Sequence, residues 1–143
     1  MYFCSAMRQI IKKEISCASF EYDVIDKILE IHLKGNIGER EAIAVVREAQ
    51  VITNKELHAN LINGSGMFQI SKGARSYFAA VDSKSLAAVA LFSNTNFHQI
   101  VGNFYLRLSR PIRPTQMFHE KKEARLWLKE CISMADAVLR EIA

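Results

Sequence analysis

The side chains that most often do chemistry are few in this chain, and they are scattered along it. The four histidines, at positions 32, 58, 98 and 119, form no H-x-x-x-H pair and have no cysteine near them in sequence. Zinc sites use such short spacings. No G-x-S-x-G, G-x-G-x-x-G or G-x-x-x-x-G-K-[ST] motif occurs, and the four aspartates suggest no carboxylate pair. We therefore expect no catalytic residue, no metal and no cofactor, and an enzyme of unrecognised type is the lesser alternative.

One segment has the composition of an anion site. Asn63-Gly64-Ser65-Gly66 is expected to be a loop, and Ser71 is expected to be the N-cap of a helix over 72–81. Free N–H groups at a helix start, together with Lys72 and Arg75, would attract an anion. The simpler interpretation is an ordinary loop followed by a capped helix.

Aromatic residues are frequent in the middle of the chain, and most of them are expected in the core. If segment 64–70 lifts off the sheet as a loop, some of them would instead line an apolar cleft. The candidates for that cleft are Phe68, Tyr77, Phe97 and Phe104.

Composition limits the class of protein. The chain has 143 residues, a formal charge of +4, and 8 glycines and prolines together, which is typical of one globular domain. No uncharged apolar run approaches the roughly 18 residues of a membrane span. Residues 65–113 carry six Lys or Arg against one Asp. That basic region suits phosphate, an acidic partner or a lipid surface, although a solvated face is commoner. No RNA-recognition motif is present, so we expect no nucleic acid.

The three cysteines, at positions 4, 17 and 131, are odd in number and scattered. That argues against a disulfide framework and favours reduced thiols in the cytoplasm. The N-terminal residues lack the apolar stretch of a signal peptide. We expect residues 1–19 to be an extension in which Ile10, Ile11 and Ile15 allow a short helix.

Hydrophobic spacing predicts the elements that must hold any site. We expect strands over 20–33 (a hairpin turning at Asp26-Lys27), 57–62, Leu86–Phe92 and Thr115–Phe118, and helices over Glu39–Thr53, 72–81, 95–108 and 121–141. Alternating strands and helices predict a mostly parallel sheet. The continuous apolar run Leu86–Phe92 is typical of a strand covered on both faces. The last helix, about 30 Å long, is expected to overhang the sheet, which favours a homodimer.

Several segments together resemble the bacterial STAS-like (SpoIIAA-like) small proteins over roughly residues 20–130. They are Ile70-Ser-Lys-Gly-Ala-Arg-Ser-Tyr-Phe78, Ala87-Ala-Val-Ala-Leu91, Ile100-Val-Gly-Asn-Phe-Tyr-Leu106, Pro114-Thr-Gln-Met-Phe118 and Glu123-Ala-Arg-Leu-Trp-Leu128. The resemblance implies the fold of anti-sigma-factor antagonists and transporter STAS domains. In outline it is also similar to lipid-exchange domains of the CRAL-TRIO type.

One departure bears on mechanism. Signalling STAS domains carry Asp-Ser-Ser/Thr-Gly at a helix start, where a partner kinase phosphorylates the hydroxyl. The corresponding residues here are Ser71-Lys72-Gly73-Ala74, which places Gly73, without a hydroxyl, at the acceptor position. The resemblance therefore does not carry the kinase switch over to this chain.

These observations lead to one expectation and one alternative. We expect a single STAS-like α/β domain over 20–143, with a mostly parallel or mixed sheet of four to five strands and about four flanking helices. It would be a non-enzymatic binding or regulatory module that meets a protein partner or small ligand. The alternative is a carrier of a small apolar, lipid-like molecule in a cleft under the 64–70 loop. The candidate binding residues are Ser71, Lys72, Arg75, Phe68, Tyr77, Phe97 and Phe104.

Overall fold

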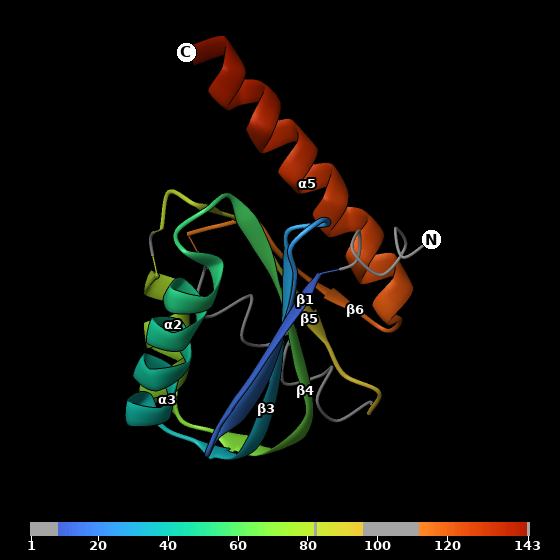
Figure 1. Cartoon of the computed structure of the whole chain (residues 1–143). Coiled ribbons are helices and arrows are strands. Elements are labelled where there is room, and N and C mark those ends of the chain that lie inside the picture. The colour runs from blue at the N-terminus through green and yellow to red at the C-terminus, as the bar shows by residue number, and fades with distance from the viewer. Residues whose placement is uncertain (1–8, 82, 96–111, 143) are drawn as a thin grey trace.

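A six-stranded mixed sheet forms the centre of the molecule (Figure 1). A computed structural model describes residues 9–81, 83–95 and 112–142. The strands lie in the sheet in chain order: β1 (Ile10–Ile15), β2 (Ala18–Asp23), β3 (Ile28–Ile37), β4 (His58–Ile70), β5 (Leu86–Phe92) and β6 (Thr115–Phe118). The first three strands are antiparallel, and β3 to β6 are parallel. The expected mixed sheet is confirmed, but six strands replace the four to five predicted.

The strand that the sequence did not predict is β1. Residues 10–15 were expected to belong to a loose extension with a short helix, and they instead pair with β2 along their whole length. The strand is exposed on both faces, so its sequence lacks the alternation that marks a half-buried strand. Its position is held by an ion pair of 2.7 Å from Lys13 to Glu48, and Lys34 pairs with Glu14. Charged side chains such as these also discourage pairing of the open edge with another chain.

The predicted hairpin at Asp26-Lys27 is present between β2 and β3. The Asp23 carboxylate accepts hydrogen bonds of 3.0 Å from the backbone N–H groups of Ile25 and Asp26. Lys27 then takes a left-handed conformation with φ of 61°. A short acceptor side chain that bonds forward along the chain is the usual device of such turns.

Helices cover both faces of the sheet. α2 (Glu39–Thr53) and α3 (Lys72–Ala80) lie on one face, and α5 (Lys121–Ile142) crosses the other (Figure 1). Each face has its own core, one packed under α2 and the other under α5. Ion pairs between α5 and the hairpin, from Lys129 to Asp26 at 3.4 Å and from Lys121 to Glu30 at 2.8 Å, help to fix the crossing. The predicted helix over 95–108 falls mostly outside the described residues.

The helix starts follow from local hydrogen bonds. The Glu41 carboxylate accepts a 2.9 Å bond from the Gly38 N–H, which satisfies a free donor at the start of α2. The Ser71 hydroxyl accepts a 3.0 Å bond from the Ala74 N–H at the start of α3. The predicted N-cap at Ser71 and the predicted bounds of α2 are therefore confirmed.

Two strand predictions were wrong in detail. Residues 63–66, expected as a loop, continue β4, which pairs with β3 as far as Ile70 through two irregularities of register. Glycine suits this stretch because a Cβ on Gly66 would lie 3.1 Å from the carbonyl oxygen of Leu33. In addition, β5 is not covered equally on both faces. Its burial alternates, with Ala88 and Ala90 buried and Val89 and Leu91 half-buried.

Candidate functional site

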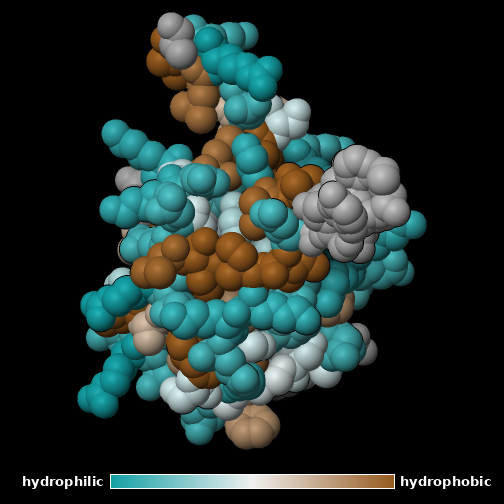
Figure 2. All heavy atoms as spheres, viewed as in Figure 1, coloured by the Kyte–Doolittle hydropathy of each residue, from teal (hydrophilic) through white to brown (hydrophobic). Residues whose placement is uncertain are grey.

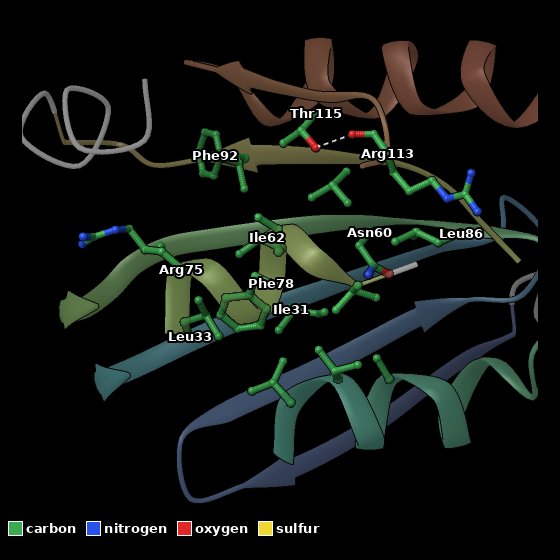
Figure 3. A pocket seen from close by; sticks show the side chains of 18 of the residues that line it. Ile31, Leu33, Asn60, Ile62, Arg75, Phe78, Leu86, Phe92, Arg113 and Thr115 are labelled. Carbon is green, nitrogen blue, oxygen red and sulfur yellow. Dashed lines mark hydrogen bonds between the residues drawn. The ribbon is translucent and has the colours of Figure 1, made fainter. Parts of the chain in front are cut away.

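An apolar cavity lies between the sheet and helices α2 and α3, and its floor is formed by two rows of side chains. The pairing of β4, β5 and β6 places Asn60, Val89 and Thr115 side by side in one row. The next row, two residues further along each strand, contains Ile62, Leu91 and Met117. All six side chains line the cavity, and Figure 3 shows several of them pointing into it.

The roof of the cavity comes from the two helices. Val45, Val46 and Ala49 line it from α2, and Phe78 and Ala79 line it from α3. The cavity is partly open to the surface, and its volume is about 140 Å³. A cavity of roughly this size, about 150 Å³, accommodates benzene when its walls are apolar.

The cavity lies where α3 packs against α2 more than against the sheet. α3 packs mainly against α2, whereas α2 contacts β2 and β3 directly. The sheet itself contributes, because β5 places the small side chains of Ala88 and Ala90 under α5 and turns Val89 and Leu91 toward α3. Those two side chains remain half-buried.

A few polar groups interrupt the apolar lining, two of them on β4. The Nδ1–H of His58 donates to the carbonyl oxygen of Glu56 at 2.8 Å, and burial lowers the pKa of His58 below 6.5. The imidazole is therefore neutral near pH 7, and its Nε2 is an acceptor. The Oδ1 of Asn60 is buried without a hydrogen-bond partner. Two acceptors on one strand thus lie at the cavity wall.

Two arginines lie toward opposite ends of the cavity (Figure 3). The Nη1 of Arg75 donates to the carbonyl oxygen of Ile70 at 3.2 Å, so this guanidinium is partly engaged by its own chain. The backbone of Arg113 accepts a 2.8 Å bond from the Thr115 hydroxyl. Among the described residues of the lining there is no Asp, Glu, Lys or Cys.

The structure brings only part of the predicted binding set to this cavity. Arg75 lines it, whereas Ser71 is occupied as the N-cap and Lys72 is exposed beside it. Phe68 is 79% exposed on β4, and Tyr77 packs at the edge of the core under α2. Phe97 and Phe104 lie outside the described residues.

The predicted position of the cleft needs a correction. Segment 64–70 is a strand and not a loop, so nothing lifts off the sheet there, although Gly64, Met67 and Ile70 do line the cavity. The sequence did not point to Asn60 or His58. The sequence held one indication of these two residues. They are polar and alternate along the strand with Ala59 and Leu61, which are apolar and buried on the opposite face of the sheet.

Within the described ranges, no group of three or more His, Cys, Asp or Glu side chains is arranged to hold a metal ion. None of the helices in the described part of the chain is both long and apolar enough to cross a bilayer. Burial raises the pKa of the thiols of Cys17 and Cys131, so neither is an activated nucleophile near pH 7.

Comparison with known proteins agrees with this fold. The chain is similar to a crystal structure of an uncharacterized protein of the DUF3478 family, with a SpoIIAA-like fold, from Shewanella loihica PV-4. The TM-score is 0.54 at 12% identity, over 84% of this chain and 92% of that one. The expected SpoIIAA-like fold is therefore confirmed, and at that identity the likeness shows the fold alone. No curated protein matches. A family model, described as a domain of unknown function (DUF7793), matches residues 22–132, and the chain therefore belongs to the DUF7793 family.

Proposed function

We propose that this protein is a non-enzymatic binding module that holds one small, mostly apolar molecule in the cavity between α3 and the sheet. The observation that carries the proposal is an apolar cavity whose wall contains a buried, unpartnered acceptor, the Oδ1 of Asn60. A buried acceptor without a partner costs free energy. A ligand that supplies a donor would remove that cost and fill the cavity at once.

The size of the cavity limits the size of the ligand that it can hold. At about 140 Å³ it is smaller than the roughly 300–1,000 Å³ of sites that enclose drug-sized molecules. It suits a single aromatic ring or a short branched chain. A long acyl chain would not fit inside, so the proposal departs from the lipid-like cargo considered from sequence.

The polar groups of the lining limit the chemical class of the ligand. Asn60 Oδ1 and the free Nε2 of neutral His58 are both acceptors, so the ligand should carry a hydroxyl or an N–H group. The arginines lie toward the two ends, and Arg75 already donates to Ile70. A neutral ligand such as a phenol therefore fits better than one with an anionic group in its middle.

The same lining supports binding in preference to catalysis. A general acid–base mechanism needs a proton donor or acceptor held against the reacting atom, with a partner that orients it. His58 is the one imidazole in the described lining, and its Nδ1 bonds to a backbone carbonyl instead of a carboxylate. No carboxylate or thiol in the described lining faces it.

The first expectation from sequence, a protein or anionic partner at the start of α3, has less support. The Ser71 hydroxyl accepts from Ala74, and Arg75 turns back onto Ile70. Lys72 alone of these three has an exposed side chain with no bond that would occupy it in the described structure. An anionic partner would therefore meet one exposed ammonium group beside two side chains that already bond within the chain.

Titration of the ¹⁵N-labelled protein with phenol and with benzene tests the proposal. We expect saturable shift changes at residues of the cavity lining with both probes, and tighter binding of phenol. Val89→Phe fills the cavity from its floor and should abolish binding of both probes. Val51→Phe is the matched control, because Val51 is 66% exposed on α2, and it should leave binding unchanged. Unchanged binding to Val89→Phe, or no saturable shifts in the wild-type lining, would overturn the proposal.

A further inference from the structure

The last turns of α5 extend beyond the body of the protein. α5 runs over Lys121–Ile142, but its buried side chains are Ala124, Leu128 and Ile132. Figure 1 shows the helix continuing past the sheet toward the C-terminus. The ten residues 133–142, which we call the projecting turns, span about 15 Å at 1.5 Å per residue.

The projecting turns continue the apolar stripe that packs on the sheet. The stripe of α5 repeats at alternating intervals of four and three residues: Ala124, Leu128, Cys131, Ala135, Val138 and Ile142. The first three pack in the core under α5. Beyond them, Val138 is 54% exposed and Ile142 is 77% exposed, and Met134 and Leu139 beside the stripe are 71% and 52% exposed. An interval of four and three is the spacing of a coiled-coil seam.

The polar side of the projecting turns carries charged side chains that pair with each other. Arg140 and Asp136 form an ion pair of 3.1 Å one turn apart. At 100° per residue they lie on the side of the helix opposite the stripe. The projecting turns are thus amphipathic, with their apolar side uncovered in the described structure and their polar side paired.

Charge decides between the possible occupants of this surface. Residues 133–142 contain one arginine against Asp136 and Glu141. A helix that lies on an anionic membrane carries several Lys or Arg on its polar side, and this one does not. A strongly charged protein partner would find little charge to complement. An apolar stripe of this kind best complements a copy of itself, as a two-fold interface requires.

We propose that the projecting turns of α5 pair with the same turns of a second copy of this chain. The seam is about one and a half heptads long, so the area that it buries is far below the roughly 800 Å² per partner of a stable complex. The dimer is therefore weak and reversible. This proposal concerns a surface separate from the cavity and does not depend on the ligand.

Sedimentation velocity of the whole chain from micromolar to millimolar concentration tests the pairing. The wild-type mass should rise toward twice the monomer value. Val138→Glu places a charge in the seam and should keep the protein monomeric throughout, a shift of at least tenfold in the dissociation constant. Ala137→Glu, at the adjacent exposed position off the seam, should dimerise like the wild type.

Two results would overturn the proposal. One is a wild-type protein that stays monomeric at millimolar concentration, and the other is a Val138→Glu protein that dimerises as before. Circular dichroism of each variant checks that α5 is still formed. Vesicles of phosphatidylcholine and phosphatidylglycerol test whether the stripe binds a membrane instead of a second copy. If the wild-type protein stays monomeric and binds these vesicles, the stripe is a membrane-binding surface.

Discussion

Replacing Asn60 by Leu removes the unpartnered acceptor of the cavity wall while keeping the number and branching of the side-chain heavy atoms. A buried acceptor without a partner costs about 1–3 kcal/mol. Because Asn60 is only half-buried as a residue, we take the lower end, about 1 kcal/mol. The ligand-free variant should therefore be more stable than the wild type. For a chain of this length the melting temperature should rise by about 3–5 °C.

The same substitution should have the opposite effect on the choice of ligand. The hydroxyl of phenol is expected to donate to Asn60 Oδ1, and one neutral hydrogen bond contributes about 1 kcal/mol, or a factor of about five in affinity. Asn60→Leu should therefore remove the preference for phenol over benzene and leave benzene bound. A gain in stability together with a loss of selectivity distinguishes an unsatisfied acceptor from a merely structural side chain.

Asn36→Leu is the matched control, since Asn36 is exposed on β3. It should change stability by less than about 0.5 kcal/mol and leave both probes unaffected. Thermal unfolding by calorimetry and the phenol and benzene titrations provide the two measurements. The reasoning is refuted if Asn60→Leu is no more stable than the wild type and still prefers phenol.

Three further predictions concern the scaffold. Leu128→Ala should destabilise the protein by about 2–5 kcal/mol, because Leu128 is fully buried between α5 and the sheet. Leu126→Ala, at a 55% exposed position of the same helix, should cost under about 1 kcal/mol. Chemical denaturation measures both values. Burial lowers the pKa of His58, so below pH 6.5 the unfolded chain binds more protons than the folded protein. The free energy of unfolding, measured by chemical denaturation, should therefore fall by up to about 1.4 kcal/mol per pH unit between pH 7 and pH 5. His58→Leu should flatten that pH profile. Ser71→Ala should cost about 1 kcal/mol through loss of the α3 cap, and Ser76→Ala, at an exposed interior position, should be neutral or slightly stabilising.

Elements with local signals were predictable from the sequence. The start of α2 and the cap at Ser71 depend on side chains within four residues of the helix start, so they are visible in a short window. The turn after Asp23 is encoded in the same local way. The parallel arrangement of β3 to β6 followed from the alternation of strands with helices.

Elements that depend on distant partners were not predictable in the same way. β1 lies at the edge with both faces exposed, so hydrogen bonds to β2, and not burial, decide that it is a strand. The segment around Gly66 resembled a loop because a close approach between strands, as at Gly66, and a turn both favour glycine.

The cavity was hidden for a related reason. It depends on the distance between α3 and the sheet, which no residue spacing records. The contrast between Ala88 and Ala90 on one face of β5 and Val89 and Leu91 on the other was present in the sequence. It was hidden because both sets are apolar, so the strand resembled one that is buried on both faces.

The most direct test of the central claim is the position of a bound probe in the cavity. In the methyl-labelled protein saturated with phenol, nuclear Overhauser contacts should link the ring to methyl groups of Ile62, Val89 and Leu91, which line the cavity floor. Contacts confined to exposed methyl groups such as those of Val51 and Leu126, or no contacts at saturation, would contradict the claim that this cavity is the binding site.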